Sequence, residues 1–244
     1  MTALDRTDYR AEKLAILAAE FDGAPPQAIL NAALTQLFTF EELALVTSFG
    51  TESAVLLHMA AQIDPGVRVI SIDTGKLFGE TRRYRDRLVT QLGLTNLTVI
   101  SPRDENLKVQ DPSGTLWAQK PDHCCYWRKV EPLDRALGGV DVWISGRKRY
   151  QAASRSALPV FELADGRIKV NPLAGWTRED LTAYFDAHQL PRHPLEADGY
   201  LSIGCMPCTD RVAPGEDARA GRWRGIDKTE CGIHMPHPAP DYAI

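Results

Sequence analysis

The sequence predicts an α/β fold in which a twisted parallel sheet carries helices on both faces. Short apolar runs alternate with helical patterns along the chain, which is typical of strand–helix–strand units. Three of these runs end at small or polar residues, as a ligand crevice at the carboxyl ends of parallel strands requires. With 244 residues, 44% of them hydrophobic, the chain is long enough for one large domain with its own core.

The expected elements begin with two helices. Residues 9–21 have the apolar spacing of an amphipathic helix, and a second helix opens at the Pro25-Pro26 pair and buries Leu37. Helical patterns then follow two strands, the second pattern covering residues 79–92. Strands are expected at four apolar runs: residues 43–49, 67–72, 97–100 and 140–145.

The pattern changes after residue 155. Asp165-Gly166 separates two short apolar runs and predicts a hairpin, and Thr177 can cap a helix over residues 178–188. Beyond Cys208 the chain is rich in glycine, proline and charge and has little periodicity. The predicted organisation is an α/β domain over 1–211, with the N-terminal helices of 8–37 packed on it, and a flexible C-terminal tail over 212–244.

Charge and hydropathy restrict the partners and the location. The 28 basic and 32 acidic residues leave a formal charge of −4, which speaks against a nucleic-acid-binding surface. No apolar run reaches the roughly 20 residues that span a bilayer, and the N-terminus shows no signal peptide. We therefore expect a cytoplasmic protein with no membrane or nucleic-acid partner. No apolar stripe identifies an interface, so a homo-oligomer is left open.

The five cysteines are grouped. Cys124 and Cys125 are adjacent, Cys205 and Cys208 form a C-x-x-C, and Cys231 stands alone. In a reducing compartment two such pairs indicate a four-thiolate site for zinc or an iron–sulfur cluster, although free cysteine can also simply be buried. An adjacent pair is an unusual half-site for zinc, which favours the cluster. The unpaired Cys231 is a candidate nucleophile.

Basic residues gather where an anion would bind. Arg147, Lys148 and Arg149 follow a predicted strand end, and Arg155 is close behind them. Guanidinium groups match phosphate and sulfate oxyanions, so in an acidic chain this grouping indicates a phosphate or sulfate site. Taken singly, each of these basic residues could equally well be an ordinary solvent-exposed surface residue.

The sequence resembles the assimilatory adenylyl-sulfate (APS) reductases, which share a family with the phosphoadenylyl-sulfate (PAPS) reductases. The resemblance covers about 43–234 and rests on four motifs: C-C at 124–125, I-G-C-M-P-C-T at 203–209, G-R-W at 221–223 and E-C-G-I-H at 230–234. It implies a fold like that of the adenine nucleotide α-hydrolases (ATP pyrophosphatases). It also implies a 4Fe–4S cluster that does not relay electrons, bound by Cys124, Cys125, Cys205 and Cys208.

The resemblance further implies Cys231 as the nucleophile and seven substrate contacts: Ser48, Asp73, Lys129, Gly146, Arg155, Arg219 and Arg222. Lys129 matches the lysine that links the cluster to the substrate. The first loop, S-F-G-T-E-S at 48–53, departs from the S-G-G-x-D-S loop of ATP-cleaving relatives and from the S-x-S-G-x-x-D form of some APS reductases. That departure puts individual loop contacts in doubt and suits an enzyme that binds no pyrophosphate.

The implied reaction is thioredoxin-dependent reduction of APS to sulfite and AMP through an S-sulfocysteine, with thioredoxin or glutaredoxin as the electron donor. PAPS is the alternative substrate, although most PAPS reductases lack the two cysteine pairs. A cluster-containing tRNA thiolase is a second alternative, which ATP consumption and tRNA binding would reveal. A thiolate-based metal or redox sensor is a third, and it predicts no turnover.

Overall fold

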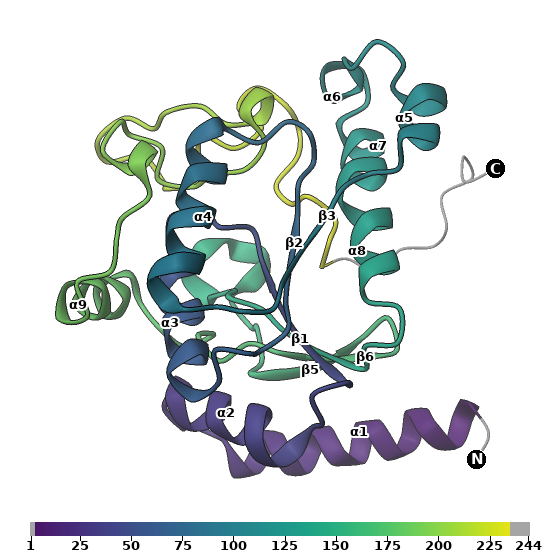
Figure 1. Ribbon diagram of the computed structural model, residues 1–244, viewed down its shortest axis with the longest axis vertical. Coiled ribbons are helices and arrows are strands. Elements are labelled where there is room, and N and C mark those ends of the chain that lie inside the picture. The colour runs from purple at the N-terminus through teal and green to yellow at the C-terminus, as the bar shows by residue number, and fades with distance from the viewer. Residues whose placement is uncertain (1–2, 235–244) are drawn as a thin grey trace.

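The computed structural model of the protein describes residues 3–234, with side chains from residue 11 onward. Its centre is one six-stranded sheet in the order β3-β2-β1-β4-β6-β5. The strands are β1 (Leu43–Thr47), β2 (Val69–Ile72), β3 (Leu97–Ile100), β4 (Val142–Ile144), β5 (Phe161–Ala164) and β6 (Arg167–Val170). Figure 1 shows this sheet between two groups of helices, which confirms the predicted α/β class.

The sheet is parallel except at one edge. β1 pairs in parallel with β2 and β4, β2 with β3, and β4 with β6. β5 pairs antiparallel with β6, because the tight turn at Asp165-Gly166 joins neighbouring strands directly. The sheet is therefore mostly parallel, as predicted, with the predicted hairpin at one edge. Asp165 and Gly166 both have positive φ, at 53° and 73°, as the turn requires.

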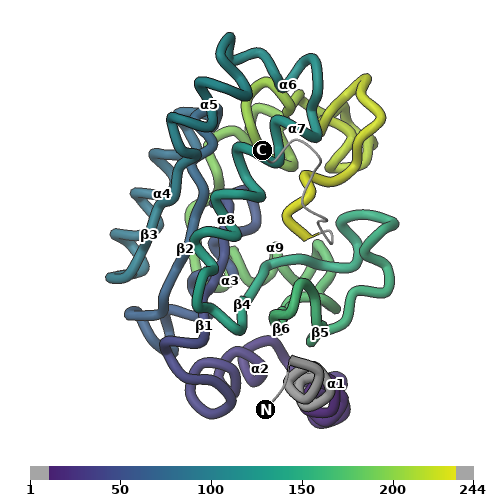
Figure 2. The backbone as a smooth tube through the Cα atoms, turned by 90° about the vertical axis from the view of Figure 1, so that its right-hand side faces the viewer, coloured from purple at the N-terminus to yellow at the C-terminus, as the bar shows by residue number. Residues whose placement is uncertain are grey.

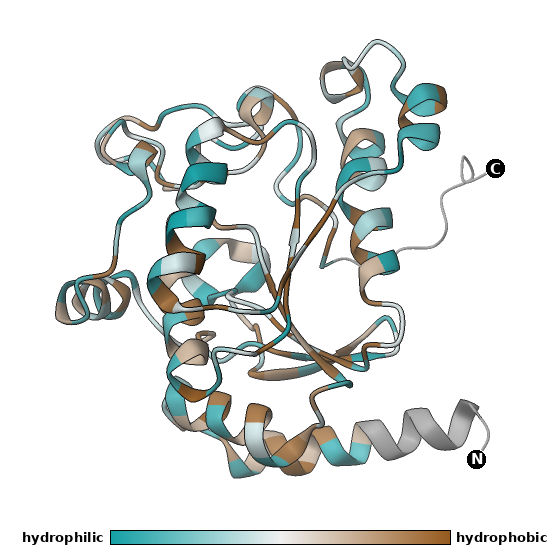
Figure 3. Cartoon of the chain, in the orientation of Figure 1, coloured by the Kyte–Doolittle hydropathy of each residue, from teal (hydrophilic) through white to brown (hydrophobic). Residues whose placement is uncertain are grey.

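The helices pack on both faces. One face carries α3 (Ser53–Ile63), α4 (Gly79–Leu92) and α9 (Arg178–Ala187), and the other carries α8 (Glu131–Ala136). α5 (Asp104–Gln110), α6 (Leu116–Gln119) and α7 (Pro121–Cys125) lie above α8, and α7 continues through a π-helical turn over Tyr126–Val130 (Figure 1). The strands are apolar and the outer helix faces polar, as burial on both faces requires (Figure 3).

The two N-terminal helices close one end of the core. α1 (Ala3–Glu20) contributes the buried side chains of Leu14 and Leu17, whereas Ala18 on the predicted apolar face is exposed. α2 (Pro26–Ala32) begins with proline and runs into a π-helical turn over Ala33–Leu37. No helix within residues 3–234 combines the length and the apolar character needed to cross a bilayer.

The C-terminal segment up to residue 234 lies against the domain. Its Trp223 is 2% exposed, and the Asp210 amide donates to the Gly221 carbonyl at 2.8 Å. Figure 2 shows this segment, in yellow, at the same end of the molecule as α6 and α7. The flexibility predicted for residues 212–244 stays a prediction, and residues 235–244 lie outside the described residues.

Candidate active site

A cavity of about 270 Å³ opens at the carboxyl ends of β1, β2 and β4, where the sequence predicts a ligand crevice. The turn after β1 forms one wall, the turn after β4 a second, and residues 201–205 and 217–234 most of the remainder. Phe49 in the first turn has a φ of 50° and is buried, so the chain bends sharply there and β1 ends before the expected residue 49. The Thr51 hydroxyl donates to the Leu201 carbonyl at 3.0 Å and ties two walls together.

The cavity is basic although the chain is acidic. Seven basic side chains line it: Lys129, Arg147, Lys148, Arg155, Arg178, Arg219 and Arg222. Only three carboxylates among the lining residues oppose them: Glu52, Asp217 and Glu230. Guanidinium groups around a concave surface favour an oxyanion ligand. Burial lowers the pKa of Arg147 to about 10, with Arg155 adding to the effect, so this wall holds positive charge that a bound anion would stabilise.

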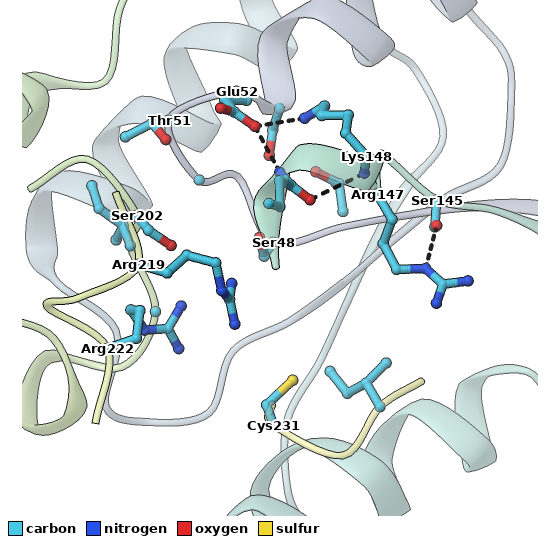
Figure 4. A pocket seen from close by; sticks show the side chains of 18 of the residues that line it. Ser48, Thr51, Glu52, Ser145, Arg147, Lys148, Ser202, Arg219, Arg222 and Cys231 are labelled. Carbon is cyan, nitrogen blue, oxygen red and sulfur yellow. Dashed lines mark hydrogen bonds and ion pairs between the residues drawn. The ribbon is translucent and has the colours of Figure 1, made fainter. Parts of the chain in front are cut away.

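Cys231 faces this basic space. In Figure 4 its sulfur points into the cavity, with Arg219 and Arg222 on one side and Arg147 on another. Burial alone would raise the pKa of the thiol, but the Lys129 ammonium, an amide N–H of Ile233 and the Arg222 guanidinium together hold it below its ordinary value. The arrangement therefore favours the thiolate, which is the nucleophilic form.

Six of the seven predicted substrate contacts line the cavity: Ser48, Lys129, Gly146, Arg155, Arg219 and Arg222. Asp73 does not belong to the lining within the described part of the chain. Its carboxylate accepts two hydrogen bonds from Arg82, at 2.9 and 3.0 Å, and one from the Gly75 amide at 2.9 Å. Those three bonds form the turn after β2, so a contact between Asp73 and a nucleotide stays a prediction.

The four paired cysteines are buried beside the cavity. Cys124 and Cys125 end α7, and Cys205 and Cys208 flank a short turn that is held by the Met206 amide donating to the Lys76 carbonyl at 2.8 Å. Burial, with the neighbouring Cys125 next in effect, raises the pKa of Cys124 to about 12. Burial likewise raises the pKa of Cys125 and Cys208, and such thiols are costly to ionise unless a metal centre compensates their charge.

The surroundings of these sulfur atoms fit a cluster. The Thr74 hydroxyl lies 3.2 Å from the Cys205 sulfur, and the buried indole Nε1 of Trp223, packed on Cys205 and Cys208, has no hydrogen-bond partner within the described chain. A hydroxyl beside the Cys205 sulfur and an indole N–H packed near these cysteines are the kinds of donor that a thiolate-bound cluster uses. No three His, Cys, Asp or Glu side chains within residues 3–234 form a ready site for a single ion. The fit to a cluster therefore rests on the chemistry of the four thiols and their neighbours.

Lys129 connects the two regions. Its ammonium is buried beside Cys205, Cys125 and Cys231 and lies 5.9 Å from the centre of the Trp223 ring. Burial would lower the pKa of Lys129, but the neighbouring cysteines raise it above its ordinary value, so the side chain is cationic. One positive charge thus lies between the paired cysteines and the cavity cysteine.

The predicted site residues do not include three residues that line the cavity. Glu52 carries a carboxylate in the first turn, Trp223 is buried against the cysteines, and the His234 ring stacks on Trp143 with an interplanar angle of 3°. Burial and four surrounding cations hold the pKa of His234 well below its ordinary value, so its ring is neutral. The G-R-W and E-C-G-I-H strings contain two of these residues, but nothing in the strings indicates their contacts.

Together the open α/β sheet, the basic cavity at its strand ends and the adjoining cysteines define an α/β protein with the adenine nucleotide α-hydrolase-like fold and a cavity suited to an oxyanion. The chain belongs to the phosphoadenosine phosphosulfate reductase domain family, whose model matches residues 42–211.

Named relatives agree with this family. The adenosine 5'-phosphosulfate reductase of Mesorhizobium japonicum is 52% identical over 95% of this chain and 91% of its own length. The phosphoadenosine 5'-phosphosulfate reductase of Gloeobacter violaceus is 40% identical over 89% of this chain and 92% of its own length.

Two solved structures resemble the fold. The phosphoadenylyl-sulfate reductase of Candida auris, solved as a phosphate complex, has a TM-score of 0.70 and 28% identity, covering 82% of this chain and 97% of that chain. The FMN adenylyltransferase of Candida glabrata has a TM-score of 0.53 at 13% identity, covering 87% of this chain and 75% of that chain, and it shares the fold alone.

Proposed function

We propose that this protein reduces adenosine 5'-phosphosulfate to sulfite and AMP in assimilatory sulfate reduction, with Cys231 as the nucleophile and thioredoxin or glutaredoxin as the electron donor. The observation that carries the proposal is the position of Cys231. Its sulfur faces a cavity at the strand ends of a nucleotide-binding fold, beside Lys129, Arg219 and Arg222. A thiolate at this position would lie next to the sulfate group of a bound substrate, and the three cations would offset the negative charge of that group.

The first step is a transfer of the sulfo group. The Cys231 thiolate attacks the sulfur atom, the bond from sulfur to the bridging oxygen breaks, and AMP leaves with that electron pair. The enzyme then carries an S-sulfocysteine. The sulfate oxygens repel an anionic nucleophile. Their charge would be offset during the attack by Lys129, Arg219 and Arg222.

The second step uses two electrons from the donor. One donor thiolate attacks the Cys231 sulfur, and sulfite leaves with the electron pair of the broken bond. The second donor thiol then attacks the mixed disulfide, which releases the oxidised donor and restores the Cys231 thiol. Such exchange needs Cys231 to become accessible to a protein, and its position on a C-terminal segment suits that requirement.

Cys124, Cys125, Cys205 and Cys208 would hold a 4Fe–4S cluster, and the proposal is supported by Lys129, Thr74 and Trp223, which lie beside these cysteines. When bound, the cluster would supply a fixed negative charge beside Lys129. In this proposal the chain's own residues carry every reaction step. Lys129 contributes by holding its ammonium between the cysteine site and the cavity.

PAPS is the alternative substrate, because relatives with that name share most of the chain. The deciding experiment measures sulfite release by anaerobically purified protein with thioredoxin, given APS or PAPS at matched concentration. Turnover on APS with little on PAPS supports the proposal. A preference for PAPS would keep the role of Cys231 and replace the substrate, and sulfite from neither would refute the reductase function.

A further inference from the structure

Two residues just after Cys231 attach its segment, residues 230–234, to the sheet. The imidazole ring of His234 stacks on the indole of Trp143, with ring centres 5.1 Å apart and an interplanar angle of 3°. Ile233 packs against an apolar cluster that contains Trp143 and includes residues of β1, β2 and α8. All three side chains line the cavity, so the end of this segment forms part of the cavity wall.

The indole in this stack is fixed by the sheet. Trp143 lies at the centre of β4, between Ala44 of β1 and Lys169 of β6, and is 2% exposed. The buried Lys169 ammonium lies 5.0 Å from the centre of the indole ring and adds a cation–π contact. His234, by contrast, belongs to a segment without helix or strand. The stack therefore joins an irregular segment to an immobile ring.

His234 takes part in this contact as a flat, neutral ring. Burial and the surrounding cations hold the pKa of His234 well below its ordinary value, so the ring carries no charge. Its Nδ1 is buried and has no hydrogen-bond partner within residues 11–234. The contact thus depends on ring area and stacking geometry and not on a hydrogen bond. A phenylalanine ring can supply the same contact, whereas an alanine side chain cannot.

The attachment on the other side of Cys231 is of a different kind. Glu230 pairs with Arg155 at 2.8 Å and with Arg219 at 3.4 Å. Both arginines are predicted substrate contacts, so a bound anion would compete with Glu230 for them. The ring stack on β4 contains no ion pair and is not subject to that competition. It is the attachment that can persist when the cavity holds a substrate.

We propose that the stacking of His234 on Trp143 is the anchor that keeps Cys231 in the cavity while a substrate anion occupies the two arginines. This inference rests on the proposed function, since it takes Cys231 as the nucleophile. His234 is a positioning residue. It acts through the backbone of the segment, in which the Ile233 amide donates to the Cys231 sulfur, and it makes no contact of its own with the sulfo group.

The first test separates positioning from nucleotide binding. The rate of Cys231 adduct formation is measured in a single turnover at saturating APS without a donor protein, and AMP affinity is measured by calorimetry. His234→Ala should form the adduct at least about tenfold more slowly, because the nucleophile is no longer held at the reacting sulfur. Its AMP affinity should match that of the wild type. His234→Phe should restore the rate, because the ring stack is kept.

Three results would overturn the anchor. They are a wild-type rate in His234→Ala, a rate in His234→Phe as low as that of His234→Ala, and a loss of AMP affinity as large as the loss of rate. The variants are made at His234 because removing Trp143 would also leave a hole in the core. His188→Ala is the matched control: His188 also contacts an aromatic ring, that of Tyr184 at 4.1 Å, but it is exposed and outside the cavity lining, so both measurements should be unchanged.

A second measurement needs no turnover. Hydrogen–deuterium exchange of the peptide that contains residues 230–234 is followed by mass spectrometry with AMP present. His234→Ala should exchange there at least about tenfold faster than wild type, since the segment opens more often, and His234→Phe should exchange at the wild-type rate. Equal exchange in wild type and His234→Ala would refute the anchor. Absence of a Cys231 adduct in wild-type protein would instead refute the proposed function, so the two failures are distinguishable.

Discussion

Glu230 and Arg155 form a bidentate ion pair in which Arg155 Nε and Nη2 each donate to a different carboxylate oxygen at 2.8 Å. The pair is largely buried, and Arg219 Nη2 approaches the same carboxylate at 3.4 Å. Glu230 directly precedes Cys231, so this contact holds the cysteine segment against the turn after β4. The same two arginines are predicted to contact the substrate. Glu230 and a bound anion would therefore compete for the same guanidinium groups.

The first prediction concerns this contact. Glu230→Gln should weaken the pairing with Arg155 and open the Cys231 segment, because a charge-assisted bidentate bond is replaced by a weaker one. We expect Cys231 to react with iodoacetamide about tenfold faster, measured on its peptide by mass spectrometry. Glu216→Gln is the matched control, since Glu216 pairs with Arg224 at the exposed surface of the same segment. Equal alkylation rates for wild type and Glu230→Gln would refute a holding role.

The second prediction concerns the buried ammonium. Lys129→Met should slow formation of the Cys231 adduct about a hundredfold, the usual cost of losing one charged group that stabilises a transition state. The measurement is a single turnover with APS in the absence of a donor protein. Lys108→Met on the exposed face of α5 should react at the wild-type rate. A wild-type rate for Lys129→Met would show that the cations elsewhere in the cavity suffice.

The third prediction concerns the paired cysteines. Cys205→Ser should abolish the bound iron and the broad visible absorption of a cluster, because one thiolate ligand is lost. Thr74→Val should retain iron but release it faster to a chelator, since the hydroxyl 3.2 Å from the Cys205 sulfur is removed. Met206→Ser, a change at an exposed neighbour, should bind iron normally. Full iron content in Cys205→Ser would contradict the assignment of this ligand.

The fourth prediction concerns pH and stability. His193 is 1% exposed, and burial lowers its pKa from 6.5 to about 4, with Glu80 opposing the shift. Its Nδ1 accepts from the Leu195 amide at 3.2 Å, so the ring must be neutral there and pairs with the Thr81 hydroxyl through Nε2.

The unfolded chain therefore takes up a proton near pH 6.5 that the folded chain takes up only near pH 4. Stability should fall as the pH decreases between these values, by about 3 kcal/mol from this group. Urea unfolding at a series of pH values measures it. His193→Gln should show a smaller slope in this range, and an identical slope would assign the pH dependence to other groups.

The alternation of apolar runs and helical patterns predicted most of the fold, because burial on both faces leaves a strong local signal. The helix at Gly79–Leu92 and the strand at Leu97–Ile100 match their predicted ranges. The start of α1 at Ala3 and the early end of β1 were not predicted, since helix ends and the positive φ of Phe49 have no periodic signature.

The contacts of the site were harder to predict than its residues. Cys231 and the cationic residues stand out in the sequence through residue type alone. Glu52 forms its ion pair with Lys148, 96 residues away in the sequence, and Glu230 forms its ion pair with Arg155, 75 residues away. Such pairs form only when the sheet brings its strand ends together. Asp73 also follows a strand, and the sequence gives no sign that its carboxylate accepts hydrogen bonds from Arg82; its contact with a ligand stays a prediction.

The most direct test of the account is a search for the S-sulfocysteine. Anaerobically purified protein is mixed with APS without any thiol donor, and its peptides are analysed by mass spectrometry while AMP is counted. The account predicts one added sulfo group on the peptide that contains Cys231, with one AMP released per chain, and neither product from Cys231→Ser. Sulfite release at the normal rate by Cys231→Ser, or an adduct on another cysteine, would contradict it.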